Sequence, residues 1–188
     1  QTAGQASIDS AELEAETKAL ADKSLLLDIT QTNAGYFAVG ERGHVLSSPD
    51  GKSWSQISGI PTRSTLTSIA AIDQKLWAAG HDGLIIASSD GGKTWVRQRV
   101  DIFVPGSDNP SQGAPILDIL FTDAQHGFAI GAYSLMLETQ DGGNTWTPRK
   151  INTVVAAPTA APVASESGTF NEADLALGEE TDPHFNSM

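Results

Sequence analysis

Short runs of apolar residues, some alternating with polar ones, recur through residues 24–150 and are separated by turns rich in glycine and aspartate. The run TLTSIAAI at 65–72 is apolar and β-branched, which predicts an inner strand buried on both faces. The runs KLWAAG, GLIIAS and TWVRQRV follow it, and the last alternates as a half-exposed outer strand does. The pattern predicts four short antiparallel strands within residues 64–100.

This four-strand pattern is repeated along the chain. YFAVGERGHVLSSPDG begins at Tyr36, LWAAGHDGLIIASSDGG at Leu76 and GFAIGAYSLMLETQDGG at Gly127, so the units are offset by 40 and 51 residues. An inserted loop at 101–115 accounts for the longer spacing, and SLLLDITQ and ILDILFT supply the inner strands of the first and third units. Repeats of four short strands at this period are the signature of β-propeller blades.

The predicted fold class is therefore all-β, a β-propeller of four-stranded antiparallel blades. Three blades are expected, at about 24–58, 64–100 and 115–152. Three blades would leave two exposed sheet edges and an unfilled centre. We interpret the sequence as the N-terminal part of a larger propeller, or as a chain that must self-associate to close one.

The flanking segments differ from the repeats in composition. Residues 1–23 form an N-terminal extension, and SAELEAETKALADK at 10–23 predicts a short helix that begins at its serine. Residues 153–183 are predicted to be an Ala/Pro-rich acidic linker or loop. Residues 184–188 resemble the start of a further blade, truncated after its first residues.

Each unit ends in a turn of the Asp-box type, Ser/Thr-x-Asp-x-Gly-x-x-Trp. SSDGGKTW and TQDGGNTW match it, and SPDGKSW is a shortened version. The aspartate can accept hydrogen bonds from backbone N–H groups of its own turn. The glycine supplies a positive φ, and the tryptophan buries its ring over the hairpin or between blades. We assign these structural roles to Ser48, Asp50, Trp54, Ser88, Asp90, Gly92, Trp95, Thr139, Asp141, Gly143 and Trp146.

A catalytic or calcium-binding role for these aspartates is the alternative. Catalysis needs a convergent cluster of groups, whereas this aspartate occurs once per blade. An EF-hand loop needs several spaced oxygen ligands, and DGGKTW offers one carboxylate. The pattern favours the architectural role.

The charge of the chain is concentrated in its flanks. The formal net charge is −12, with six acids and two bases in residues 1–28, eleven acids and nine bases in 29–150, and six acids without any Lys or Arg in 151–188. The central region lacks the basic stripe that nucleic-acid binding requires, and the absence of cysteine excludes disulfides and thiolate chemistry. No apolar run approaches the roughly 20 residues that span a bilayer. The start QTAGQAS suits the residue after signal-peptide cleavage, which predicts an exported, periplasmic or secreted protein.

The repeats resemble the BNR/Asp-box propellers, and more closely the family of photosystem II assembly factors related to Ycf48 and HCF136. SLLLDI, GYFAVGERGHVLSSPDGKSW and AAGHDGLIIASSDGGKTW carry this likeness, which spans residues 24–150. The resemblance implies a seven-bladed, exported, non-catalytic protein that needs no cofactor. It also implies a role in the assembly of membrane complexes, through binding of a protein or peptide partner such as a complex subunit.

A glycan-binding protein or sialidase-like glycoside hydrolase is the alternative function, since sialidases share the Asp-box. Enzymes of that group need three arginines that converge on the substrate carboxylate, together with a Tyr–Glu nucleophile pair. The region 29–150 holds five arginines and two tyrosines, and the Arg-Ile-Pro motif of that group is absent, because GIPTR has glycine before its Ile-Pro. The sequence therefore favours the non-enzymatic interpretation.

A binding site is expected on the loops away from the Asp turns, because repeat proteins carry function on the loops of one face. Arg42 and Arg63 could clamp a carboxylate of an extended peptide, and the other interpretation of each candidate is a solvated loop residue. His44 is expected to be a polar residue at the end of a strand. No two histidines have metal-ligand spacing, so neither a metal nor a cofactor is predicted. The candidate binding residues are Glu41, Arg42, Arg63, His81, Asp82, Phe103 and Tyr133.

Overall fold

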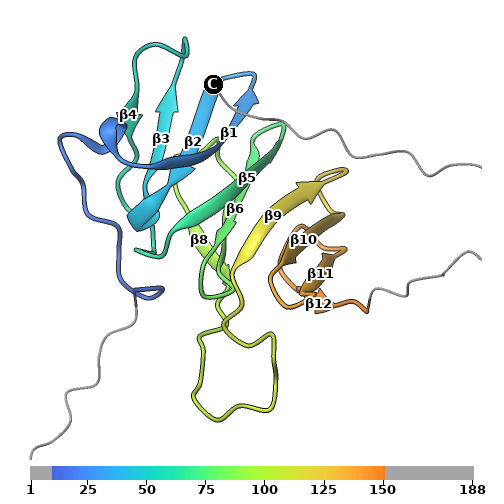
Figure 1. Ribbon diagram of the computed structural model, residues 1–188. Helices are drawn as coiled ribbons and strands as arrows, with labels where there is room; N and C mark the ends of the chain where they lie inside the picture. Colours follow the sequence, from blue (N-terminus) through green and yellow to red (C-terminus); the bar gives the residue numbers. More distant parts are fainter. Residues whose placement is uncertain (1–9, 151–188) are drawn as a thin grey trace, which may run out of the picture. The chain divides into compact units, whose positions relative to one another are not determined.

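The computed structural model describes residues 10–150 (Figure 1). The chain divides into two units, Gln1–Asn152 and Thr153–Met188, and all the described residues lie in the first. The predictions for 153–183 and 184–188 fall outside the described residues. Within residues 10–150, no helix is long and apolar enough to cross a membrane.

Within the described residues, three antiparallel sheets of four strands each follow one another along the chain. The first contains β1 (Leu26–Thr32), β2 (Gly35–Gly40), β3 (Val45–Ser48) and β4 (Ser55–Gln56); the second β5 (Leu66–Ile72), β6 (Lys75–Gly80), β7 (Ile85–Ser88) and β8 (Val96–Arg99); the third β9 (Ile116–Phe121), β10 (Gly127–Gly131), β11 (Met136–Thr139) and β12 (Thr147–Pro148). Strand order within each sheet follows chain order. The predicted all-β class with four-stranded antiparallel blades is confirmed.

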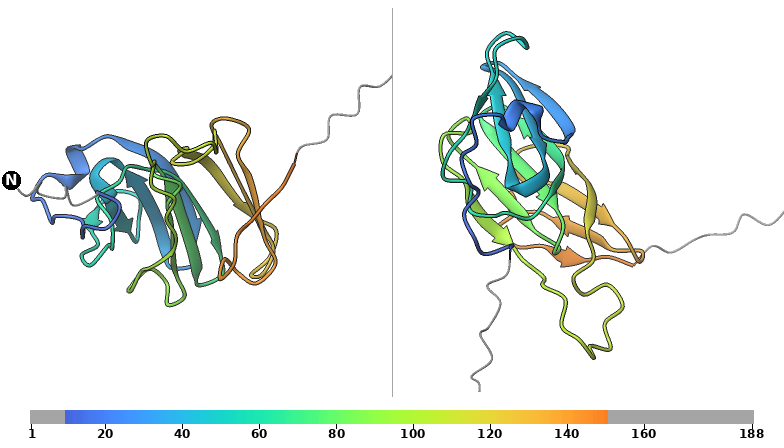
Figure 2. Two further views of the ribbon diagram at one scale, coloured as in Figure 1. Left: turned by 90° about the horizontal axis from the view of Figure 1, so that it is seen from below. Right: turned by 60° about the vertical axis from the view of Figure 1, so that its left-hand side comes forward.

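The three blades stack face to face in chain order (Figure 2). One core lies between blades 1 and 2, where Phe37, Val39 and Val45 of the first meet Leu66 and Ile69 of the second. A second core repeats this arrangement between blades 2 and 3, with buried residues that include Trp77, Ile85, Ile116 and Leu137. Blade 2 thus buries both of its faces, which explains why its inner strand, β5, consists of an apolar run.

The inner strands are joined across blades by a chain of polar side chains. The Ser68 hydroxyl lies 3.0 Å from Asp28 Oδ2 and 2.9 Å from Asp118 Oδ1. Asp28 Oδ2 also accepts the backbone N–H of Ile69 at 2.8 Å. β1 and β5 are irregular at Asp28 and Ser68, where a β-bulge redirects the side chain. The three inner strands β1, β5 and β9 are therefore linked by side chains as well as by apolar packing.

The third blade exposes one apolar face. Ile130 occupies the register position of Val39 and Ala79, which are fully buried by the following blade. Ile130 itself is 47% exposed, and Leu117 and Leu120 on β9 are exposed as well. Within the described residues nothing covers this face.

The N-terminal extension does not form the helix predicted over 10–23. Its helical part is a single 3-10 turn, η1 (Ala21–Lys23), and residues 14–18 have no regular secondary structure. The segment instead bonds to the blades: the Ala15 N–H donates to the Ile60 carbonyl at 2.8 Å, and Ala15 is buried. Contacts made by a small apolar side chain outweighed the local helix propensity, which is a weak determinant in a tertiary context.

Candidate functional site

The Asp turn of blade 2, between β7 and β8, is a closed hydrogen-bond network. Asp90 accepts the N–H of Lys93 at 3.0 Å, the N–H of Thr94 at 2.9 Å and the Thr94 hydroxyl at 2.6 Å. The Ser88 hydroxyl donates to Asp90 at 2.8 Å and accepts the N–H of Gly92 at 2.9 Å. The carboxylate therefore satisfies donors of its own loop.

The other two Asp turns use the same chemistry. In blade 3, Asp141 accepts the N–H and the hydroxyl of Thr145 at 2.9 and 2.7 Å, and the Thr139 hydroxyl at 2.8 Å. In the shorter turn of blade 1, Asp50 accepts the N–H groups of Lys52 and Ser53, both at 2.8 Å. Within the described residues there is no group of three or more His, Cys, Asp or Glu side chains placed to hold a metal ion.

The Asp turn of blade 2 also contacts the preceding blade. Gly92 has φ +84°, and a Cβ atom at this position would lie 2.4 Å from Cε1 of Phe37 in blade 1. Trp95 is 6% exposed, and its indole N–H donates to the Gly92 carbonyl at 3.0 Å. Only glycine meets both requirements, a left-handed backbone and a close approach to a neighbouring ring.

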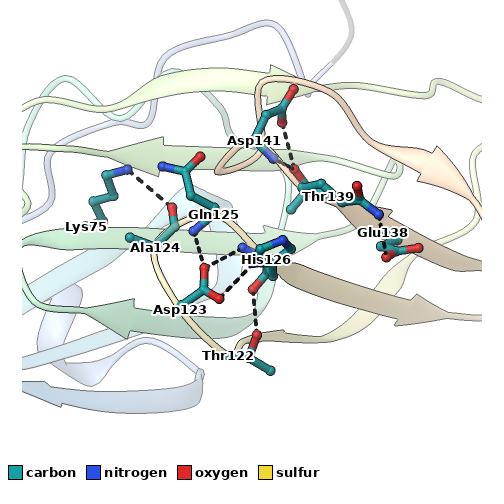
Figure 3. Close-up of polar contacts among 10 residues, drawn as sticks. Lys75, Thr122, Asp123, Ala124, Gln125, His126, Glu138, Thr139 and Asp141 are labelled. Atoms are coloured by element: carbon teal, nitrogen blue, oxygen red, sulfur yellow. Dashed lines mark hydrogen bonds and ion pairs between the residues drawn. The ribbon is translucent and has the colours of Figure 1, made fainter.

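The Asp turn of blade 3 lies beside the β9–β10 turn, as Figure 3 shows. There Asp123 accepts the N–H groups of Gln125 and His126 at 2.7 and 2.9 Å, and its other oxygen lies 2.8 Å from Nδ1 of His126. The bonds from these N–H groups and from the imidazole lower the pKa of Asp123 to about 2, the Gln125 N–H having the largest effect. Lys75 of blade 2 donates to the Ala124 carbonyl at 3.3 Å, so this face is also tied across blades.

We expect the Asp turns to make folding acid-sensitive. The hydroxyl and N–H of Thr94 hold the pKa of Asp90 far below its ordinary range. A carboxylate with a depressed pKa stabilises the fold above its unfolded-state pKa, and that stability is lost as the pH falls through the folded-state pKa. Asp90→Asn should therefore lower the Tm at neutral pH and flatten the fall of Tm below about pH 4.

The matched control for this prediction is Asp108→Asn, which changes an exposed carboxylate of the 101–115 loop. Thermal unfolding followed by circular dichroism from about pH 7 down to about pH 2 covers the relevant titration range. Identical Tm profiles for Asp90→Asn and the wild type would show that the network does not contribute to stability.

The opposite face carries the turns between second and third strands, which we call the loop face: residues 41–44, 81–84 and 132–135, with the 101–115 loop. Antiparallel pairing places these turns at the other end of each blade from the Asp turns, and Figure 1 shows the 101–115 loop projecting away from the sheets between β8 and β9. The same position of each turn has a positive φ although it is not glycine, namely Arg42 at 58°, Asp82 at 58° and Tyr133 at 55°. These side chains are presented by a left-handed backbone, which is uncommon for residues other than glycine, asparagine and aspartate.

Arg63 is engaged by the N-terminal extension. Its guanidinium donates to the Glu14 carbonyl at 2.8 Å and lies 3.1 Å from the Glu16 carboxylate. Lys18 most strongly, and then Arg63 and Arg42, lower the pKa of Glu16, so both predicted clamp residues act electrostatically on one carboxylate. The sequence contains no local signal for this pairing, because Glu16 and Arg63 are far apart along the chain.

The remaining candidates fall into two groups. Asp82 accepts a hydrogen bond from the Ser64 hydroxyl at 2.5 Å, and Glu41 accepts one from the N–H of Leu25 at 3.3 Å. Both carboxylates therefore bind the segment that leads into the inner strand of their own blade. The other four are exposed on the loop face: Arg42, His81, Phe103 and Tyr133. The Arg42 side chain makes no hydrogen bond or ion pair within residues 10–150, and Phe103 and Tyr133 are 64% and 73% exposed.

His44 lies directly before β3, at the strand end where the sequence placed it, but its side chain is buried and not exposed to solvent. It is 1% exposed, and neither ring nitrogen has a hydrogen-bond partner within the described residues. The equivalent turn positions in the other blades hold Leu84 and Leu135, both buried. Burial is the main cause that lowers the pKa of His44, so the fold favours the neutral imidazole.

Comparison with known proteins adds to this geometry. A sequence model of the family described as "Photosynthesis system II assembly factor YCF48" matches residues 8–113 and 110–160. The chain belongs to this family. "Photosystem II assembly lipoprotein Ycf48" of Prochlorococcus marinus is 46% identical over 52 residues, which is 28% of this chain and 14% of that protein. The protein of the same name from Synechococcus sp. (strain CC9902) is 30% identical over 125 residues, 64% of this chain and 35% of that protein.

A solved structure described as "YCF48 bound to D1 peptide" is similar to this Ycf48-family chain with a TM-score of 0.54 at 19% sequence identity. The similarity covers 66% of this chain and 40% of that one, and at this identity it shows the propeller fold alone. The chain therefore spans well under two thirds of the length of these Ycf48 proteins.

Proposed function

We propose that this chain is part of an exported, non-enzymatic assembly factor that binds a protein or peptide partner, such as a subunit of a membrane complex. Membership of the Ycf48 family carries this proposal. The relatives named assembly lipoproteins support export, and the related structure described as bound to a D1 peptide supports an extended peptide as the partner. The exposed apolar face of blade 3 supports a propeller that continues beyond three blades.

The binding surface in this proposal is the loop face. Arg42 supplies an exposed cation, and Phe103 and Tyr133 supply exposed aromatic surface. An exposed cation and exposed aromatic rings on the loop face suit a peptide that carries a carboxylate and apolar side chains. Glu41, Arg63 and Asp82 act indirectly here, since they hold the turns and the N-terminal extension.

The arrangement of the arginines bears on the sialidase-like alternative. Arg63, Arg99 and Arg149 each pair with an acidic side chain of the chain itself, and Arg97 donates to the Ala11 carbonyl. Within residues 10–150 these arginines therefore do not form a convergent, unpaired trio. This supports the non-enzymatic function over glycoside hydrolysis.

Charge reversal at Arg42 tests the proposed surface. We expect Arg42→Glu to weaken capture of a labelled D1 peptide about tenfold, because a charge-assisted hydrogen bond becomes a repulsion. The matched control is Lys52→Glu, which makes the same charge change at an exposed residue of an Asp turn on the opposite face. Fluorescence anisotropy measures both affinities, and equal losses in the two variants would refute a specific site on the loop face.

A further inference from the structure

A cleft of about 460 Å³ lies between blades 1 and 2 on the side of the Asp turns. Phe37, Ser47 and Ile57 of blade 1 line it together with Gly91 and Lys93 of the second Asp turn. Its volume falls within the roughly 300–1,000 Å³ typical of ligand pockets. The sequence predicts binding on the other face, so this cleft has no counterpart among the predicted sites.

The equivalent cleft between blades 2 and 3 is smaller, about 190 Å³. It is lined by Trp77, Ala87, Val96, Gln98 and Gly142. The two clefts are built from corresponding strands and the following Asp turn, and they differ in the side chains that each blade supplies and in the register shift between β7 and β8. The repeat thus provides an internal comparison.

The comparison shows what fills the smaller cleft. Trp77, paired with Ala87, stands where blade 1 has Phe37 paired with Ser47. The Trp77 indole N–H donates to the Gly142 carbonyl at 3.0 Å, and the Gln98 amide donates to the same oxygen at 3.1 Å. The Trp77 indole ring therefore reduces the volume of the second cleft. The Gly142 carbonyl in this cleft already accepts two hydrogen bonds.

The larger cleft lacks both donors. The Phe37 ring has no N–H. Ile57, which follows Trp54 at the same sequence distance as Gln98 follows Trp95, lines this cleft in place of the glutamine. The carbonyl of Gly91, the counterpart of Gly142, accepts no hydrogen bond from the described residues. The cleft between blades 1 and 2 thus combines the apolar side chains of Phe37 and Ile57 with polar lining residues, unfilled volume and a carbonyl acceptor that no described residue uses.

We propose that this cleft binds a tryptophan side chain of a partner peptide, whose indole N–H donates to the Gly91 carbonyl as Trp77 does to Gly142. The exposed ammonium of Lys93 at the rim makes no ion pair within residues 10–150 and favours a carboxylate next to the bound ring. The site is separate from the loop face, so it does not depend on the Arg42 proposal.

Titration of the chain with N-acetyl-tryptophan, N-acetyl-tryptophanamide and N-acetyl-phenylalaninamide tests the site. Amide NMR signals of Gly91, Gly92 and Lys93 should shift saturably with N-acetyl-tryptophan, with a Kd on the order of 0.1–1 mM for a ligand of this size. The tryptophan amide should bind several-fold more weakly, and the phenylalanine analogue, which lacks the ring donor, more weakly again. Equal affinity for the tryptophan and phenylalanine amides, or saturable shifts confined to the loop face, would overturn the proposal.

Two substitutions should plug the cleft from within. Phe37→Trp introduces the ring that the next blade already accommodates, and Ser47→Leu fills the same space from β3 should the first variant fail to fold. Either should weaken N-acetyl-tryptophan binding at least tenfold. Phe128→Trp, the same change at the equivalent position of blade 3, is the matched control and should leave the affinity unchanged. Lys93→Ala should abolish the preference for the carboxylate probe over its amide. Unchanged binding in a folded plug variant would exclude the assigned cleft.

Discussion

Trp77→Ala is expected to lower the free energy of unfolding by about 3–5 kcal/mol, the range for removing a large aromatic side chain from a core. Trp77 is 1% exposed and lies in the core between blades 2 and 3. Its ring is stacked on Phe121 with centroids 3.6 Å apart and planes at 13°, and Phe121 meets Trp146 edge-on at 5.9 Å. The indole N–H also bonds to Gly142 of the third Asp turn, so one side chain joins two blades through packing and through a hydrogen bond.

Trp77→Phe separates these two contributions. Phenylalanine keeps a ring to stack on Phe121 but cannot donate to Gly142, and we expect a loss of about 1–2 kcal/mol. Urea denaturation followed by far-ultraviolet circular dichroism gives both values. A loss below about 1 kcal/mol for Trp77→Ala would show that the blade interface does not hold the two sheets together as described.

His44→Leu is expected to stabilise the protein by about 1–3 kcal/mol at neutral pH, because it removes two buried nitrogens that lack hydrogen-bond partners within residues 10–150. Leucine fits the turn by precedent, since Leu84 and Leu135 fill the equivalent positions. The effect should grow on acidification. Burial first, and the nearby Arg42 and Lys18 in addition, lower the pKa of His44 from its ordinary value of 6.5, while Glu41 opposes them.

The sign of the pH dependence follows from proton uptake. As the pH falls below an unfolded-state pKa near 6.5, the unfolded chain binds more protons at His44 than the folded chain, so wild-type stability falls until the pH reaches the lower folded-state pKa. The leucine variant lacks this component. Urea midpoints at about pH 7.5 and about pH 5.5 bracket the ordinary histidine pKa. His81→Ala, at an exposed histidine of the corresponding turn in blade 2, is the control. A constant difference between His44→Leu and the wild type at both pH values would contradict the expectation.

The repeated features of the chain were predictable because each is encoded locally. The alternation of apolar residues and the spacing from Gly40 to Asp50 recur in every unit, and a tryptophan closes each unit four or five residues later. Strands and tight turns are determined by neighbours in sequence. The fold class, the strand order and the link of each Asp turn to the third and fourth strands followed from this pattern. The predicted N-terminal helix did not form. Ala15 of this segment is instead buried in a cluster with Ile60, and its backbone N–H donates to the Ile60 carbonyl.

The candidate sites depended more on contacts between distant segments. The sequence placed Arg63 among exposed binding residues, yet it pairs with Glu16 of the extension. The sequence suggested a solvent-exposed His44, but the folded turn buries this side chain. Neither outcome has a local signal, since burial and pairing depend on which segments the blade stack brings together.

The sequence by itself determined the architecture of this protein: a repeat of four strands, an Asp turn in each blade and membership of the Ycf48 family. The tertiary structure decided which side chains are free to bind. Packing one blade on the next sets the size of each cleft, so that Phe37 leaves a space that Trp77 fills one blade later. The physical reason is that hydrogen bonds within a turn are local, whereas burial, charge pairing and cleft volume are properties of neighbours in space.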